Sequence, residues 1–293
     1  MADPGSLSRP AVSRRFAVLR AVGRDRLGIV GAVLLLLAIV AALFAPLLAP
    51  YDPTLIHPSD RLAAPGARYL LGADALGRDL VSRALYGTRV SLQVSFTAVS
   101  LASAVGITIG LLAGYFRGVT DLVLMRIMDV IFAFPTILLA LALVAVLGPD
   151  LQNLIIAITI VYVPAFARIT RGSTLVAREE LYVEAARSIG VTHRRAMVRH
   201  VLPNVSAPII VQFTVSLAYA ILVEASLSFL GLGIQPPAPS WGSMLATGKP
   251  YVELSPWLSV VPGVAIVLTV LSFNLLGDGM RDALDPRLRS RDP

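Results

Sequence analysis

The sequence predicts an all-α polytopic membrane protein with six transmembrane helices. Three observations lead to this fold class: 56% of the 293 residues are hydrophobic, only 15% are charged, and six apolar runs are long enough to cross a bilayer. Because a soluble domain carries about 25% charged residues, a soluble enzyme and a disordered protein are excluded. The chain has no cysteine, which excludes disulfide scaffolds and thiolate metal sites. Backbone groups in lipid must be paired within their own segment, so each run is expected to be a helix.

The six runs differ in how clearly they indicate a span. We place them at Gly28–Leu48, Ser91–Gly114, Leu122–Leu147, Leu151–Ala167, Pro208–Leu230 and Trp257–Leu276. The first is longer than the apolar region of about 7–15 residues in a signal peptide, and no A-x-A site follows it, so we expect a retained span. The third contains Arg126, Asp129 and Pro135, and the fourth is the shortest and contains Pro164. Both prolines allow kinks, and Arg126 and Asp129 are expected to pair with each other or to extend toward the membrane surface.

The polar segments between the runs divide the chain. We assign a cytoplasmic N-terminal segment 1–27, a first helix 28–48, an outer-face loop 49–90, a five-helix core 91–278 that contains a cytoplasmic loop 168–207, and a cytoplasmic tail 279–293. The segment 1–27 is either an interfacial amphipathic helix or a basic tail that only sets topology, and the sequence leaves both open. The loop 49–90 is rich in proline and too short for a catalytic domain, so a structured cap on the outer face is expected.

The distribution of basic residues predicts the orientation, because cytoplasmic loops of membrane proteins carry an excess of Lys and Arg. With both termini inside, nineteen of the 25 Lys and Arg residues lie in cytoplasmic segments. The six that lie outside are Arg61, Arg68, Arg78, Arg83, Arg89 and Lys249. We therefore predict an N-in, C-in topology. The net charge of +7 does not indicate nucleic-acid binding, because the basic residues lie between apolar runs rather than in one basic domain.

The most informative polar stretch is the cytoplasmic loop 168–207. Apolar and charged side chains alternate at helical spacing over 181–189, so a short amphipathic helix is expected there. Glu184 on this helix can pair with Arg187 or Arg178, which lie about one turn or two away.

The same loop contains signals for a turn and a second helix. Gly190 is expected to end the first helix as a C′ glycine. A second short helix, Thr192–Val201, is expected to end at Leu202–Pro203. A loop that only connects two spans needs about six residues. A folded, amphipathic loop of this length therefore predicts a protein partner.

These residues carry a resemblance to a known family. The loop resembles the EAA loop of membrane subunits in binding-protein-dependent ABC importers, in Glu184-Ala185-Ala186, Gly190 and Leu202-Pro203. It departs from that pattern at His200, where the family usually has isoleucine. The chain also contains four motif stretches, Leu71–Asp79, Glu224–Gly233, Pro239–Gly242 and Gly277–Arg287. They are similar to those of the C-type permease of dipeptide, oligopeptide and nickel importers, although Ala73 stands where threonine is commoner. The resemblance covers residues 15–290.

The resemblance implies the type I ABC importer permease fold in a bacterial inner membrane, with the last five helices as the shared core. It implies half of a translocation pathway, with dipeptides or longer peptides as substrates, although similar sequences handle nickel chelates and haem-like ligands. The implied partners are two nucleotide-binding ATPase subunits or one fused ATPase, a paralogous second permease, an extracytoplasmic substrate-binding protein and membrane lipid, with no nucleic acid. Coupling to the ATPase would rest on Glu184, Ala185, Ala186, Gly190, Leu202 and Pro203.

Catalytic motifs are missing from the sequence. The single lysine, Lys249, has the wrong glycine spacing for a Walker A motif and is followed by Pro250. The three histidines, His57, His193 and His200, are scattered over two compartments and predict no metal cluster. We therefore expect a non-catalytic transport subunit without a cofactor, with ATP hydrolysed by another chain.

Besides Asp129, a second acidic residue lies inside a predicted span. Glu224 in the fifth run either lines the transport pathway or fixes helix packing through hydrogen bonds, and we favour the structural role.

Two rival functions remain open at this point. A self-contained secondary carrier or channel should show more acids at the membrane midplane and an internal repeat. A polytopic membrane enzyme should show clustered His, Asp or Ser at one membrane face. The sequence shows neither, so the permease subunit is preferred.

The predicted topology can be tested directly in this cysteine-free chain. A Thr192→Cys variant is expected to stay unlabelled by an impermeant maleimide in intact cells, because its loop lies inside, and to be labelled after permeabilisation. A Leu254→Cys variant in the outer segment is the control and is expected to label in intact cells. Labelling of the Thr192→Cys variant in intact cells would overturn the topology.

Overall fold

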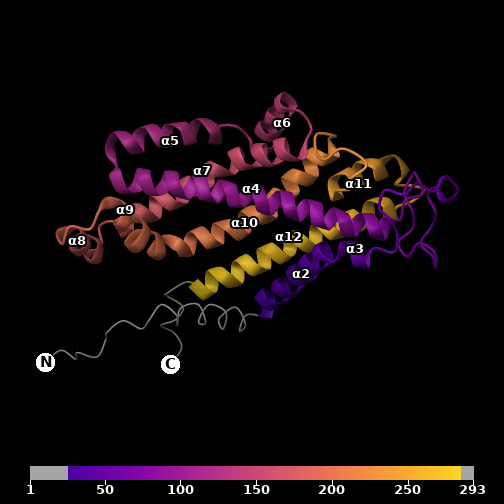
Figure 1. Cartoon of the computed structure of the whole chain (residues 1–293), viewed down its shortest axis with the longest axis horizontal. Helices are drawn as coiled ribbons and strands as arrows, with labels where there is room; N and C mark the ends of the chain where they lie inside the picture. Colours follow the sequence, from indigo (N-terminus) through magenta and orange to yellow (C-terminus); the bar gives the residue numbers. More distant parts are fainter. Residues whose placement is uncertain (1–25, 285–293) are drawn as a thin grey trace.

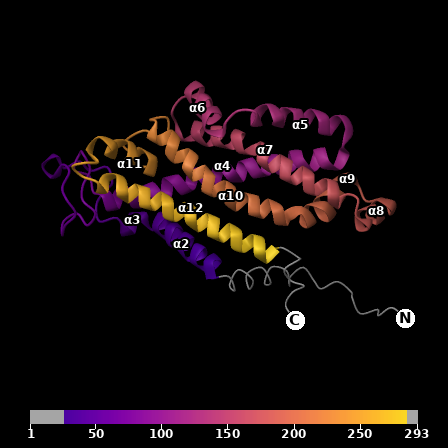
Figure 2. The same ribbon diagram turned by 180° about the vertical axis from the view of Figure 1, so that it is seen from behind.

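In the computed structural model, which describes residues 26–284, long helices lie side by side and run from one end of the molecule to the other (Figure 1). They are α2 (Arg26–Leu43), α3 (Ala45–Leu48), α4 (Leu80–Phe116), α5 (Gly118–Phe132), α6 (Thr136–Leu147), α7 (Leu151–Ala177), α8 (Leu181–Ser188), α9 (His193–Arg195), α10 (Leu202–Phe229), α11 (Trp241–Gly248) and α12 (Trp257–Leu284). Short helical turns add Pro58–Asp60, Ala196–Val201 and Lys249–Tyr251. Figure 2, the view from behind, again shows α8 and α9 at one end and α11 at the other. Most of the N-terminal segment 1–27, for which two interpretations were left open, and most of the tail 279–293 lie outside the described residues.

The predicted all-helical membrane fold is confirmed. Within the described part of the chain, five helices are long and apolar enough to cross a membrane, and a sixth crossing is counted if α5 and α6 form one bent span. Several helices extend well beyond the predicted runs: α4 begins at Leu80, α7 continues to Ala177, α10 begins at Leu202, and α12 continues to Leu284. Pro164 lies inside α7 without ending it.

The third run is two helices rather than one. The axes of α5 and α6 differ by 88°, and the chain breaks at Ala133 and Phe134. Pro135 explains the break, because proline has no N–H for the helical ladder and disfavours helical backbone in the residue before it. The same proline then precedes α6, where a missing N–H costs nothing. The predicted kink is therefore a bend of nearly a right angle.

A stripe of glycines brings α4 and α7 into close contact. Gly106, Gly110 and Gly114 follow one another at intervals of four residues on one face of α4. A Cβ added at Gly110 would lie 2.5 Å from the Ala167 carbonyl oxygen, and one added at Gly114 would lie 2.8 Å from the Cβ of Thr174. Small residues at this spacing let two helix backbones approach, which is the main source of helix association in lipid.

The outer segment is folded, as predicted. Asp74 is buried and accepts hydrogen bonds from the backbone N–H groups of Leu76 (2.8 Å) and Arg78 (3.0 Å). Its other oxygen pairs with the Arg78 guanidinium at 2.7 Å and lies 3.4 Å from that of Arg83. Gly77 has a φ of +76°, and a Cβ there would overlap the backbone of His57. The motif Leu71–Asp79 thus builds a turn that closes the loop just before α4 begins.

A second outer motif fixes α11 against α4 and α10. Ser240 and Ser243 form a reciprocal capping box at the start of α11. The Trp241 side chain is buried, and its Nε1 donates to the Ala84 carbonyl at 3.4 Å. A Cβ at Gly242 would overlap the Ala225 carbonyl oxygen. This motif therefore holds the outer ends of three helices together.

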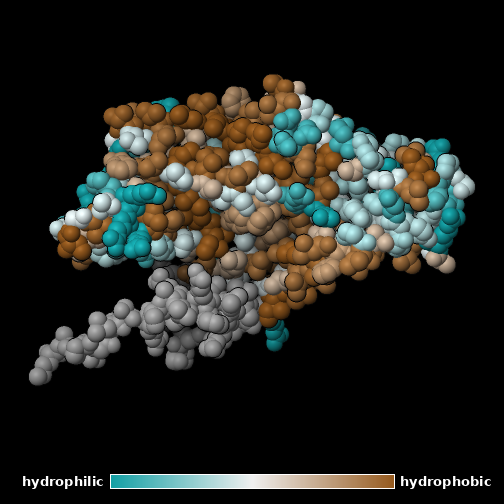
Figure 3. Space-filling view, in the orientation of Figure 1, coloured by the Kyte–Doolittle hydropathy of each residue, from teal (hydrophilic) through white to brown (hydrophobic). Residues whose placement is uncertain are grey.

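The surface separates into an apolar belt and polar ends. Figure 3 shows hydrophobic residues over α5 and α6 and hydrophilic residues gathered toward the two ends of the molecule. On α5, Val119 is 76% exposed, and Leu122 and Val123 are also exposed. Bare apolar side chains on this scale indicate contact with lipid rather than with water.

The glycine stripe gives a stability prediction with a matched control. Gly110→Ala is expected to lower the stability of the purified protein by about 1–3 kcal/mol, because its Cβ would force α4 and α7 apart. The control Gly172→Ala changes a residue of α7 that has open space around it, and its effect on stability is expected to be neutral or slightly stabilising. Thermal unfolding followed by size-exclusion chromatography measures both, and an unchanged midpoint for Gly110→Ala would contradict the close contact.

Candidate functional site

The loop between α7 and α10 carries the residues singled out in the sequence, and its helix α8 projects from the end of the bundle (Figure 1). Val183 and Ala186 are the buried residues of α8, which packs against the π-helical turn Ala196–Val201. On the other side Leu181 is 80% exposed, and Ile189, just after the helix, is 82% exposed. Bare apolar side chains on a folded, projecting loop indicate a surface that a partner covers.

Gly190 ends α8 as predicted. Its φ is +82°, a left-handed conformation that glycine adopts without strain. The Gly190 N–H donates to the Arg187 carbonyl at 3.0 Å, and the Val191 N–H donates to the Ala186 carbonyl at 3.1 Å. These two bonds form a Schellman motif, which satisfies the last carbonyl groups of the helix. The direction in which the chain leaves α8 is therefore fixed by the turn.

The EAA residues divide between two faces of α8. Glu184 and Ala185 are exposed, whereas Ala186 faces the bundle, so only Ala185 leaves room for close approach by a partner. Glu184 and Arg187 line a polar surface hollow of about 580 Å³. The expected pairing of Glu184 is wrong, since no ion pair of its carboxylate occurs within residues 26–284. Arg178 instead bonds to the Tyr115 carbonyl at the end of α4 and lies near the carboxylate of its neighbour Glu179.

The base of the loop is fastened to the end of α4. Tyr115 Oη and His193 Nδ1 lie 3.2 Å apart, and their rings pack edge to face. The Arg117 guanidinium bonds to the Glu179 carboxylate at 2.6 Å. The Arg178 guanidinium donates to the Tyr115 carbonyl. Contacts on both sides of α8 therefore hold it in one position relative to α4.

Two more ion pairs connect α5 to α7. Asp129 bonds to Arg168 at 2.7 Å, and Asp121 bonds to Arg171 through two parallel hydrogen bonds, one of them 2.6 Å long. The expected pairing of Asp129 with Arg126 is therefore wrong: packing of α5 on α7 brings a better-placed guanidinium to the carboxylate. The sequence holds no signal for these partners, because they are separated by 39 and 50 residues.

The second predicted helix does not end at Leu202–Pro203. A short α9 passes through the π-helical turn Ala196–Val201 and continues directly as α10. Pro203 stands in the first turn of α10, directly after the π-helical turn that interrupts the regular α-helical ladder. Leu202 packs partly buried against the core. These two residues therefore anchor the return of the loop into the membrane and lie away from the exposed face of α8.

Glu224 lies far from the loop, in the outer half of α10. Its side chain is fully buried, and Oε1 accepts a hydrogen bond from Ser228 at 2.8 Å. The hydroxyl groups of Ser91 and Ser240, also buried, lie near the same carboxyl. Oε2 has no hydrogen-bond partner among residues 26–284. The carboxyl group thus sits where α4, α10 and the start of α11 meet, a position that favours the packing role.

Two further observations describe the polar groups of the structure. Within residues 26–284 no group of three His, Asp or Glu side chains is close enough to hold a metal ion. On α8, partial burial raises the pKa of the Tyr182 phenol, and the nearby Glu180 carboxylate raises it further. The phenol is therefore neutral at physiological pH and can act on a partner only by packing and hydrogen bonding.

The chain matches known families and proteins over most of its length. Residues 106–290 match the family "binding-protein-dependent transport system inner membrane component", and residues 17–65 match "N-terminal TM domain of oligopeptide transport permease C". It is 46% identical to the dipeptide transport system permease protein DppC of Alkalihalophilus pseudofirmus, covering 96% of this chain and 92% of that one. It is also 46% identical to the glutathione transport system permease protein GsiD of Pectobacterium atrosepticum, covering 91% and 89%.

Two solved structures share the fold. One is an amino acid ABC transporter, with a TM-score of 0.55 and 20% identity over 69% of this chain and 94% of that one. The other is the MetNI methionine ABC transporter in inward-facing conformations, with a TM-score of 0.56 and 19% identity over 69% and 97%. The expected type I importer permease fold is thereby confirmed.

The environment of Glu224 predicts a mild phenotype. A Glu224→Gln variant is expected to keep the Ser228 hydrogen bond, so substrate uptake should change by less than about tenfold, which corresponds to about 1.4 kcal/mol. Uptake is measured beside the amount of assembled complex. Lost uptake with normal assembly would instead place the carboxylate in the transport pathway as a charge.

Proposed function

The chain belongs to the binding-protein-dependent transport system inner membrane components, and on this premise we propose that it forms half of a pathway for peptides and couples to separate ATPase subunits through α8. It is a multi-pass permease subunit of an ABC importer. This membership gives no support to a self-contained carrier or channel. What the proposal adds is the element that couples, the partners and the substrate class.

One observation carries the coupling proposal: α8 is held rigidly on one side and left bare on the other. The bundle side is fixed by buried Val183, the Schellman turn at Gly190 and the contacts to Tyr115. The free side presents Leu181 and Ile189 around the exposed Glu184. A rigid helix with a bare apolar and acidic face suits docking in a groove of a cytoplasmic ATPase, because movement of the groove is then passed to the bundle instead of being absorbed by the loop.

The route from α8 into the membrane supports the same proposal. The chain enters the loop from α7 and leaves it through the turn Ala196–Val201 into α10, and both helices continue to the other end of the molecule. A displacement of α8 therefore moves two spanning helices together. We infer that closure of two ATPase subunits pulls on α8 in this way and alternates access to a pathway shared with a paralogous permease. The ATP chemistry lies wholly in the partner subunits.

The substrate class is proposed from the relatives. Proteins 46% identical to this chain are named for transport of dipeptides, di- and tripeptides and glutathione. All of these are short peptides, so we infer that this importer takes up short peptides delivered by an extracytoplasmic binding protein. The folded outer segments around Asp74 and Trp241 give such a protein a rigid surface to dock on.

Charge reversal on α8 tests the coupling directly. Glu184→Arg is expected to reduce co-purification of the ATPase and dipeptide uptake by at least about tenfold, because a reversed charge at a contact can cost several kcal/mol. Gly190→Pro should do the same, since proline fixes φ near −65° where the turn needs +82°. The amount of inserted permease should stay unchanged, because the spanning helices do not depend on the loop.

A matched control separates coupling from general damage. Glu253→Arg makes the same charge change on an exposed acid at the outer end and is expected to leave ATPase co-purification intact. Normal co-purification and uptake in both α8 variants would refute the coupling role. Normal coupling with no dipeptide uptake in the unmodified complex would refute only the substrate class.

A further inference from the structure

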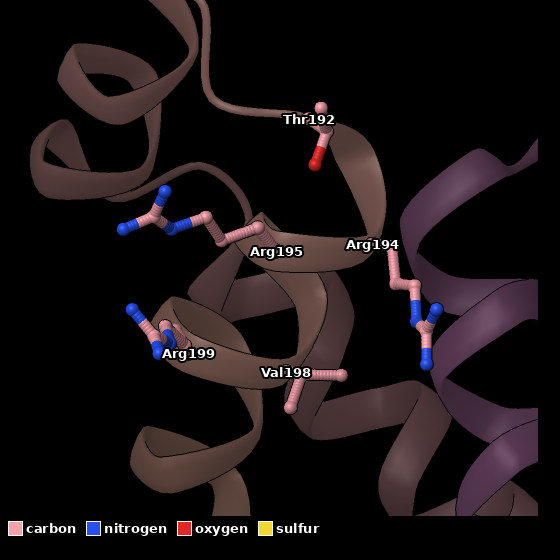
Figure 4. A pocket seen from close by; sticks show the side chains of 5 residues that line it. All are labelled: Thr192, Arg194, Arg195, Val198 and Arg199. Carbon is pink, nitrogen blue, oxygen red and sulfur yellow. The ribbon is translucent and has the colours of Figure 1, made fainter.

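A basic hollow lies beside α8 and has no role in the proposed coupling. It measures about 580 Å³ and is lined by Thr192, Arg194, Arg195, Val198 and Arg199. Figure 4 shows the Arg195 and Arg199 side chains extending to one side of the turn and the Arg194 side chain extending to the opposite side, with Thr192 above and Val198 below. Arg195 and Arg199 thus bring two guanidinium groups to the same side of the hollow, Arg194 borders it from the other side, and Val198 is its one apolar side chain.

The three arginines have no anionic partner in the part of the chain that the structure describes. No ion pair or hydrogen bond to their guanidinium groups occurs within residues 26–284, and no Asp or Glu lines the hollow. Arg195 and Arg199 are four residues apart, a spacing at which like charges on a helix repel each other. The helical ladder there is also π-helical, from Ala196 to Val201, a geometry frequent at functional sites. An anion between the guanidinium groups would remove the repulsion.

The hollow lies at the level where the lipid-facing surface begins. His193, next to Arg194, packs against the rings of Tyr115 and Phe116 at the end of α4. Helix α5 starts two residues after Phe116, and its Val119 is 76% exposed on the apolar belt. Headgroups of the inner leaflet occupy this boundary between apolar surface and water. The exposed Val198 at the edge of the hollow suits the glycerol region of a lipid.

We propose that this hollow binds the phosphate group of an anionic phospholipid from the inner leaflet. Arginine is suited to phosphate because its planar fork makes two parallel hydrogen bonds to two oxygens. Basic pockets at the cytoplasmic side of membrane helices bind anionic headgroups in this manner. The lipid would neutralise the base of α10 and hold the end of the coupling loop at the membrane surface, while α8 extends beyond it toward the ATPase.

The geometry favours lipid over the ATPase as the occupant. The bare apolar residues Leu181 and Ile189 flank α8, which projects further from the bundle than α9 does (Figures 1 and 2). The ATPase therefore meets α8 first, and the hollow lies on the bundle side of that contact. The neighbouring guanidinium groups of Arg195 and Arg199 also suit an anion with several oxygens, which a phosphate diester provides within one group.

The test uses the whole transporter in nanodiscs of phosphatidylcholine with and without phosphatidylglycerol. After transfer to neutral detergent, phosphatidylglycerol retained by the complex is counted by mass spectrometry. The triple variant R194Q/R195Q/R199Q is expected to retain at least about tenfold less of it, because each basic residue contributes separately to binding an anionic lipid. The matched control is R281Q, which removes an exposed cation from α12 at the same end of the molecule. This variant should retain as much phosphatidylglycerol as the unmodified complex.

Three outcomes would overturn the proposal. The triple variant retaining as much phosphatidylglycerol as the unmodified complex would show that the hollow binds no lipid. Displacement of phosphatidylglycerol by millimolar inorganic phosphate alone would show a site for a soluble anion. Loss of ATPase co-purification in the triple variant, with phosphatidylglycerol still retained, would assign the arginines to the ATPase contact. The lipid count does not depend on uptake, so its failure is distinct from failure of the coupling role.

Discussion

The close contact between α4 and α7 is the constraint on which the rest of the structure depends. Because lipid tails are as apolar as the helix side chains, the hydrophobic effect does not drive two helices together in a membrane. Dispersion between closely fitting surfaces holds them instead. Gly106, Gly110 and Gly114 provide that fit by letting the backbone of α4 rest on α7 around Ala167 and Thr174. Since α7 leads directly into the loop that carries α8, the glycine contact also decides where α8 is held.

Each end of the bundle is then fixed by polar contacts suited to its surroundings. At the outer end, buried Asp74 organises the loop before α4, and the capping box at Ser240 holds α11 over α10. At the inner end, Asp121–Arg171 and Arg117–Glu179 tie α5 and the loop to α4 and α7. Such pairs at the membrane surface are individually weak. Together with the packed helices they hold α8 rigidly at the end of the bundle, as the proposed coupling requires.

The parts of this arrangement that follow from local chemistry could be predicted from the sequence. Hydropathy predicted the spans, and Gly190 predicted the end of α8, because both depend on a few neighbouring residues. The start of α4 at Leu80 was missed, since its first turns are polar and are stabilised by the outer loop. The partner of Asp129 was mistaken, because Arg168 reaches it only once α5 has packed on α7.

Other features had a sequence signal that was not used. The spacing of Gly106, Gly110 and Gly114 is visible in the sequence and is a known signature of helix contact in membranes. The continuity of α9 into α10 was hidden by Pro203, because proline usually breaks a helix and the sequence does not reveal the π-helical turn that precedes it here. The most direct test of the proposal that α8 docks on the ATPase is a benzophenone amino acid placed at Ala185 in the whole transporter. We predict a light-induced adduct with the ATPase subunit. Adducts with lipid alone, or no adduct with any other chain, would contradict the proposal.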